Sequence, residues 1–216
     1  MNIVSAAPAK ALTAIERYYR FHSRIYDATR WSFLFGRDAL IKQAAKLIAP
    51  ARVLEVGCGT GKNLLHLARR FPNAFITGVD LSDTMLDVAQ KKTALFDDRV
   101  ELEQRCYDRP IDAGSYDLVI FSYALSMFNP GWEQAIKAAR EDLREGGHLA
   151  VVDFHHSISP AFRRWMGVNH VRMEGHLLPT LEADFATTVK DVRRAYGGLW
   201  QYVLFIGQKS SANSTT

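Results

Sequence analysis

The chain has 216 residues, of which 48% are hydrophobic and 23% charged, and its formal net charge at pH 7 is +4. These are ordinary proportions for a globular protein of one domain. No apolar run approaches the roughly 18 residues that cross a bilayer, and the first residues lack the apolar stretch of a signal peptide, so we expect a cytoplasmic chain. The only cysteines, Cys58 and Cys106, do not suggest a disulfide framework.

The positive charge is concentrated near the N-terminus. Residues 1–46 contain eight Lys and Arg against three Asp and Glu, whereas the remainder is nearly neutral. Such a balance favours an acidic partner, either nucleic acid or anionic lipid. Apolar side chains between Leu12 and Tyr26 recur at helical spacing. We therefore expect residues 1–36 to form amphipathic helices, which either pack on the rest of the chain or act as a lid that contacts an anionic membrane surface.

After this segment, strand-like and helix-like stretches alternate. The apolar spacing of residues 37–49 predicts a helix that Pro50 ends. Short apolar runs then predict strands, and the periodic stretches between them predict helices. The expected strands are 52–56, 75–79, 100–105, 116–122 and 148–154, and the expected helices are 62–70, 84–92 and 132–145. This alternation predicts a parallel sheet with helices on both faces.

The end of the chain departs from the alternation. Residues 187–195 and 199–208 predict two antiparallel strands around Gly197-Gly198. The expected fold is therefore α/β, a doubly wound, mostly parallel seven-stranded sheet with a C-terminal antiparallel hairpin. Its domain would span residues 37–209, with 155–186 as a functional cover and 210–216 as a disordered tail.

A glycine-rich loop follows the first expected strand, in the order Glu55-Val56-Gly57-Cys58-Gly59-Thr60-Gly61. Glycines let a ligand approach bare backbone, and the next helix offers N–H groups. The third glycine breaks the G-x-G-x-x-G spacing of a pyrophosphate loop, and the Glu55 carboxylate suits an ammonium group better. The loop resembles the E/D-x-G-x-G-x-G signature of the Rossmann-like, class I S-adenosylmethionine-dependent methyltransferases. This resemblance implies that Glu55, Gly57, Cys58, Gly59, Thr60 and Gly61 hold the methionine end of the donor.

The same resemblance implies the rest of the donor site. Asp80 ends the second strand and is expected to accept both ribose hydroxyls, since Ser82 is available to cap the next helix. Met85 lies where the family places an apolar residue against adenine, although a place in the core is the alternative. Four further donor contacts are expected from the strand ends. They are Leu81, Cys106, Tyr107 and Asp108, with Ser122 beside them.

The methyl acceptor is expected beyond the carboxyl edge of the sheet, near Tyr123 and His155. Amino methyltransferases of nucleic acid typically carry (N/D)-P-P-(Y/F) after the fourth strand. Here the sequence is Ser122-Tyr123-Ala124-Leu125, so nucleic acid is not expected as a partner. Four histidines lie between positions 155 and 176, but no cysteine joins them and their spacing fits no zinc site, so no metal is expected.

The N-terminal string Tyr26-Asp27-x-x-Arg30-Trp31-x-Phe-Leu-Phe-Gly-Arg resembles bacterial phospholipid-type N-methyltransferases. It is most similar to the diacylglycerylhomoserine N-methyltransferases, which make betaine lipid by three successive N-methylations. This resemblance implies an enzyme at the inner face of the membrane, paired with a homoserine-lipid synthase. Phosphatidylethanolamine N-methylation, a soluble amine or a C-methylated quinone precursor, and a donor-binding protein without transferase activity stay open as alternatives.

Candidate acceptor residues follow from the chemistry of such a substrate. Aromatic faces hold a trimethylammonium group, an Arg fork binds a carboxylate or phosphate, and a His or Tyr relays the proton that nitrogen loses. The candidates for catalysis are Tyr19, His22, Tyr26, Tyr123 and His155, and those for substrate binding are Arg30, Trp31, Arg163 and Arg172.

Overall fold

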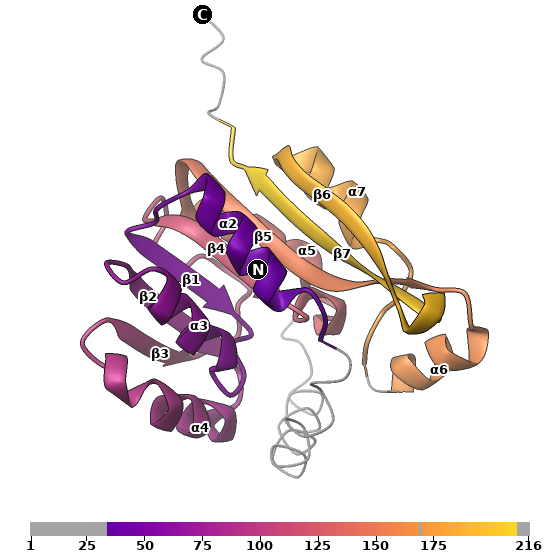
Figure 1. Cartoon of the computed structure of the whole chain (residues 1–216), viewed down its shortest axis with the longest axis horizontal. Helices are drawn as coiled ribbons and strands as arrows, with labels where there is room; N and C mark the ends of the chain where they lie inside the picture. The colour runs from indigo at the N-terminus through magenta and orange to yellow at the C-terminus, as the bar shows by residue number, and fades with distance from the viewer. Residues whose placement is uncertain (1–33, 169, 211–216) are drawn as a thin grey trace, which may run out of the picture.

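The computed structural model of the chain describes residues 34–168 and 170–210. Its centre is a seven-stranded sheet with the strand order β3-β2-β1-β4-β5-β7-β6. The first five strands in the chain run parallel, while β7 is antiparallel to both β5 and β6. The predicted mostly parallel sheet with a C-terminal antiparallel hairpin is therefore confirmed, and Figure 1 shows helices on both of its faces.

The elements follow the expected alternation closely. The strands are β1 Arg52–Val56, β2 Phe75–Asp80, β3 Val100–Gln104, β4 Tyr116–Ser122, β5 Leu143–Ser157, β6 Ala186–Ala195 and β7 Trp200–Gln208. The helices are α2 Arg37–Leu47, α3 Lys62–Arg70, α4 Asp83–Thr93, α5 Trp132–Asp142, α6 Pro160–Val168 and α7 Leu177–Asp184, with short 3-10 turns η1 Ala94–Phe96, η2 Leu125–Met127 and η3 Tyr196–Gly198.

Apolar side chains of the helices pack against both faces of the sheet. On one face, Leu40 of α2 and Leu64 of α3 are fully buried, and on the other Ile136 of α5 and Leu181 of α7 are. Each such side chain contributes about 1.5–3 kcal/mol when it leaves water. Within the described part of the chain, no helix is long and apolar enough to cross a bilayer.

The boundary between α5 and β5 differs from the prediction. The sequence predicts a helix to residue 145, but α5 ends at Asp142 and β5 begins at Leu143. Asp142 accepts hydrogen bonds from the backbone N–H groups of Ile111 and Asp112 at 2.8 Å each, and Leu143 adopts extended dihedrals. The pairing register between β4 and β5 then shifts, so that the glycines at 146 and 147 lie in an irregular strand rather than after a helix.

The expected cover, residues 155–186, contains more regular structure than its sequence indicates. The strand β5 continues to Ser157, and α6 and α7 follow. An isolated antiparallel bridge between His156 and Glu174 closes the segment back on β5. Met166 is the one buried residue of α6.

The order of the strands reverses between β1 and β4, because β2 lies on one side of β1 and β4 on the other. In open α/β sheets, ligands bind at the carboxyl edge beside such a reversal. We therefore expect a ligand site at the carboxyl ends of β1, β2 and β4.

Candidate functional site

The loop after β1 is shaped by three glycines with positive φ. Gly57, Gly59 and Gly61 have φ values of 71°, 54° and 74°, which L-residues rarely adopt. The N–H groups of Gly57 and Cys58 both donate to the carbonyl oxygen of Val79, at 2.8 and 3.0 Å, and so join the loop to β2.

These glycines differ in what surrounds them. A Cβ on Gly61 would lie 2.8 Å from the Cβ of Ala89, so close packing of α4 requires glycine there. A Cβ on Gly59 would meet nothing within 4 Å. Because Gly59 also lines a cavity, its bare backbone is open to a ligand.

Asp80 is the last residue of β2 and lies directly beside this loop. One carboxylate oxygen accepts from the N–H of Gly59 at 2.8 Å, and the other accepts from the N–H of Ser82 at 3.0 Å. These two hydrogen bonds fix the orientation of the carboxylate, which can accept about four in all. Ser82 caps α4, as predicted, by accepting from the N–H of Met85. Asp80 is thus held in a pose that suits a vicinal diol such as a ribose.

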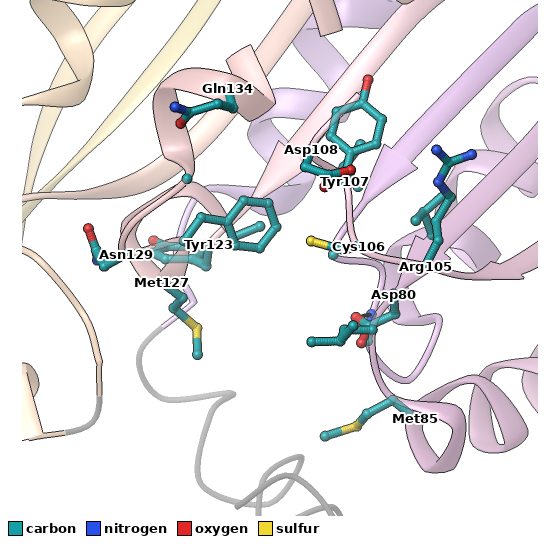
Figure 2. A pocket seen from close by; sticks show the side chains of 18 of the residues that line it. Asp80, Met85, Arg105, Cys106, Tyr107, Asp108, Tyr123, Met127, Asn129 and Gln134 are labelled. Atoms are coloured by element: carbon teal, nitrogen blue, oxygen red, sulfur yellow. Dashed lines mark hydrogen bonds between the residues drawn. The ribbon is translucent and has the colours of Figure 1, made fainter. Parts of the chain in front are cut away.

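The cavity at this edge has a volume of about 460 Å³, within the range of small-molecule sites. Figure 2 shows Asp80 and Met85 on one side of it, Tyr123, Met127 and Asn129 on the opposite side, and Tyr107 and Asp108 between them. Eight of the predicted donor residues line it. They are Gly57, Gly59, Asp80, Leu81, Met85, Cys106, Tyr107 and Asp108.

The wall expected to face adenine is held by a buried carboxylate. The Tyr107 hydroxyl donates to Asp142 at 2.7 Å, and Asp142 also accepts from the N–H groups of Ile111 and Asp112. Burial, followed by the charge of Asp142, raises the pKa of Tyr107 above its ordinary range, so the phenol stays protonated. The ring of Tyr107 is therefore a fixed wall of the cavity rather than a titrating group.

Five predicted donor residues do not line the cavity. They are Glu55, Cys58, Thr60, Gly61 and Ser122. Glu55 is 2% exposed, and burial raises its pKa to about 8, although the charge of Arg37 and a hydrogen bond with Asn63 oppose the rise. Since Asn63 belongs to α3 and Arg37 to α2, the Glu55 carboxylate lies on the side of the loop that those helices cover. Glu55 therefore does not line the cavity, and its contact with the donor stays a prediction.

Tyr123, a candidate for catalysis, lines the cavity at the end of β4 in an unusual backbone conformation. Its φ is 57°, and its hydroxyl donates to the carbonyl oxygen of Phe35 at 2.7 Å. Burial raises the pKa of Tyr123 well above its ordinary value, and the nearby Asp153 charge adds to this. The hydroxyl therefore keeps its proton, and the residue ties the cavity to the segment that precedes α2.

The remaining described acceptor candidates lie outside this cavity. His155, near the end of β5, has an Nδ1 atom that is buried and makes no hydrogen bond with another described residue. Burial and the neighbouring His156 lower the pKa of His155, so the ring is neutral near pH 7. Arg163 donates to the carbonyl oxygen of Ser157 at 2.7 Å, and Arg172 forms an ion pair with Glu174 at 2.6 Å.

Two further predictions concern a metal site and the N-terminal candidates. Among residues 34–168 and 170–210, no group of three or more His, Cys, Asp and Glu is placed to hold a metal ion. Tyr19, His22, Tyr26, Arg30 and Trp31 lie outside the described residues.

One wall of the cavity was not predicted from the sequence. The segment after β4 contributes Met127, Phe128, Asn129, Pro130, Gly131 and Gln134. The short turn η2 presents these residues to the donor side, and Asn129 is held there because its amide donates to the carbonyl of Ser126 at 2.8 Å. The signal was the Asn-Pro-Gly sequence between β4 and α5, which is typical of a loop close to the sheet edge.

Comparison with known proteins agrees with this geometry. Residues 53–147 match the family model described as a methyltransferase domain. The malonyl-[acyl-carrier protein] O-methyltransferase of Priestia megaterium is 36% identical over 142 residues, which are 65% of this chain and 51% of that protein. The demethylmenaquinone methyltransferase of Porphyromonas gingivalis is 29% identical over 67% of this chain and 62% of its own length. The chain thus spans about half to three fifths of these relatives.

Solved structures share the fold at low identity. The 1,6-didemethyltoxoflavin N1-methyltransferase of Burkholderia thailandensis, bound to S-adenosylhomocysteine, gives a TM-score of 0.71 at 16% identity and covers 98% of this chain and 94% of its own. The N-methyltransferase NodS of Bradyrhizobium japonicum, also bound to S-adenosylhomocysteine, gives 0.68 at 18% identity and covers 81% and 86%. Residues 53–147 therefore resemble a methyltransferase domain, and the chain has the fold of the class I, S-adenosylmethionine-dependent methyltransferases.

Proposed function

We propose that this chain transfers the methyl group of S-adenosylmethionine to the amino group of a lipid head group, with diacylglycerylhomoserine as the leading substrate. The observation that carries the methyl-transfer part is the cavity that Gly59 and Asp80 line together. Gly59 offers bare backbone to it, and Asp80 offers a carboxylate whose orientation two backbone N–H groups fix.

The residues of the cavity would each serve a simple task. When bound, the donor supplies an electrophilic methyl group on a sulfonium sulfur. Gly57 and Gly59 would hold the methionine end, Asp80 would accept the ribose hydroxyls, and Met85 and Tyr107 would keep water from the adenine. Tyr123, fixed by its hydrogen bond to Phe35, would align the acceptor at the mouth of the cavity.

A lipid acceptor is supported by the resemblance of the N-terminal string and by the distribution of charge. Residues 1–46 are strongly basic, which suits an anionic membrane surface. A peripheral position at the inner face of the membrane, next to an enzyme that makes the homoserine lipid, is part of the proposal. The names of the relatives indicate a quinone or an acyl carrier protein instead, so both are alternatives that an experiment must separate.

Methylation of an amine releases one proton for each methyl group added. We assign its acceptance to His155, because the ring is neutral near pH 7 and Nδ1 makes no hydrogen bond with a described residue. Its position near the end of β5 puts it at the carboxyl edge, where the acceptor would approach. Arg30 is the leading candidate for binding the carboxylate of the head group.

The test compares initial rates of methylation in mixed micelles. Diacylglycerylhomoserine should react on the order of a hundredfold faster than phosphatidylethanolamine. An Arg side chain positioned to bind the carboxylate of the first lipid would bind the phosphate of the second and leave its amine misaligned with the methyl group. Arg30→Ala should remove that preference. Equal or faster methylation of phosphatidylethanolamine would make it the substrate. Methylation of demethylmenaquinone or malonyl-acyl carrier protein alone would overturn the lipid part of the proposal and leave methyl transfer intact.

A further inference from the structure

Large apolar side chains are exposed around α6 and the start of β7. Ile158 and Val168, at either end of α6, are 74% and 75% exposed, and Trp165 between them is 52% exposed. Tyr196 and Leu199, in the turn between β6 and β7, are 54% and 38% exposed. We call these five residues the α6 surface. Figure 1 shows α6 and this turn at the same end of the molecule.

Hydrogen bonds join the two parts of this surface. The Ser157 hydroxyl donates to the carbonyl oxygen of Leu199 at 2.6 Å, and the Arg163 guanidinium donates to the carbonyl oxygen of Ser157 at 2.7 Å. Ser157 also pairs with Trp200 in the sheet. Ile158, the next residue, is therefore held beside the start of β7, so the exposed side chains form one surface.

The sequence around this surface contains no acidic residue. There is no Asp or Glu between positions 154 and 173, or from 192 to the end of the chain. Arg164 and Arg194 are exposed there and form no ion pair with another described residue. The surface thus combines projecting apolar side chains with uncompensated positive charge.

That combination favours a bilayer over a protein partner. Side chains that are about three quarters exposed project into solvent and do not line a groove that a peptide or a domain would fill. Trp, Tyr and Arg are the residues that concentrate at the interface between lipid and water, and exposed Arg side chains attract anionic head groups.

The position of the surface fits the same conclusion. β5 ends at Ser157 and β7 begins at Trp200, so both parts lie at the carboxyl edge of the parallel strands. The donor cavity opens at that edge. A bilayer against α6 would therefore face the side on which an acceptor must approach.

We propose that the α6 surface docks the chain on a bilayer that contains anionic lipid, with Ile158, Trp165 and Val168 inserted among the head groups. This inference rests on the proposed function only for the reason why the chain would dock. The docking itself needs neither the methyl donor nor methyl transfer.

The test is co-sedimentation of the full chain with vesicles of equimolar phosphatidylcholine and phosphatidylglycerol, without S-adenosylmethionine. The double variant Ile158→Ser, Val168→Ser should bind at least tenfold more weakly, since it removes two side chains from the apolar contact. The double variant Arg164→Gln, Arg194→Gln should bind about tenfold more weakly and lose most of the salt dependence. The matched control is Leu95→Ser, because Leu95 is 88% exposed in η1, far along the sheet order from α6.

Binding of the Ile158→Ser, Val168→Ser variant at the wild-type level would overturn the proposal and assign any membrane contact to another part of the chain. An equal loss of vesicle binding in Leu95→Ser would also overturn the proposal, because any exposed apolar side chain would then contribute to binding non-specifically. Wild-type chain that self-associates through this surface, with vesicle binding unchanged in the variants, would assign the surface to a second copy. Vesicle binding that follows the prediction while no lipid is methylated would keep this inference and reject the proposed substrate.

Discussion

The donor side and the acceptor side of the sheet edge are built differently. On the donor side, backbone groups and a carboxylate satisfy one another, as the bonds from Gly59 and Ser82 to Asp80 show. On the acceptor side, buried nitrogens of His155, His176 and Trp200 make no hydrogen bond with another described residue. A buried polar group without a partner is costly, so such groups indicate a place for water or a ligand. Glu55 and Ser122, at the ends of β1 and β4, also have a buried oxygen without such a partner. The difference between the two sides therefore lies in Asp80, whose carboxylate two backbone N–H groups orient before a ligand binds.

The largest effect is expected from Asp80→Ala. Each hydrogen bond to a charged group contributes about 1.5–3 kcal/mol, so losing two ribose contacts should weaken S-adenosylhomocysteine binding about a hundredfold or more in calorimetry. Asp83→Ala is the matched control, because Asp83 is exposed, accepts a hydrogen bond from the N–H of its neighbour Thr84 and does not line the cavity. An unchanged dissociation constant in Asp80→Ala would contradict the donor site.

Alanine substitutions at the glycines should affect donor binding and the free energy of unfolding differently. Gly59→Ala and Gly114→Ala place alanine at similar positive φ values with nothing within 4 Å, so each should lose about 1–2 kcal/mol of stability. Only Gly59→Ala should also weaken donor binding, by about tenfold, because only Gly59 lines the cavity. Gly61→Ala should be the least stable of the three, since its Cβ would meet Ala89.

Chemical denaturation and calorimetry on the three variants check these expectations. If Gly59→Ala and Gly114→Ala bind the donor equally well, the bare backbone at Gly59 does not contact it.

A smaller effect is expected from Glu55→Gln, which tests a residue that the sequence assigns to the donor but that does not line the cavity. The folded-state pKa of about 8 lies above the ordinary value of 4.5, so the folded chain holds a proton that the unfolded chain releases. Stability should therefore fall as the pH rises from about 5 to about 8, by on the order of 3 kcal/mol. Glu55→Gln should flatten that dependence in urea unfolding and leave donor affinity within about threefold. A tenfold loss of affinity would restore Glu55 as a donor contact.

Most of the fold and several residues that line the cavity were predictable from the sequence. The strand bounds of β1 and β4 and the helix bounds of α3 agree with the prediction, because short apolar runs and helical periodicity determine them locally. Gly57, Gly59 and Asp80 were predictable because each has a backbone conformation or position that few other residues provide.

The rest could not be predicted because it depends on tertiary contacts. Glu55 precedes the loop in the sequence, but strand alternation turns its side chain toward α2 and α3 rather than the cavity. The wall formed by Met127 and Phe128 depends on how η2 packs against β5, where Asp153 accepts from the N–H of Ser126 at 3.1 Å. No local pattern reports that contact between residues 27 positions apart.

The most direct test of the whole account is transfer of a radiolabelled methyl group from S-adenosylmethionine to a lipid extract. Wild-type chain should put label into the organic phase, Asp83→Ala should do the same, and Asp80→Ala should put in almost none. Label that stays in the aqueous phase with every form of the chain, or enters lipid equally well with Asp80→Ala, would contradict the claim that this cavity holds the methyl donor for a lipid acceptor.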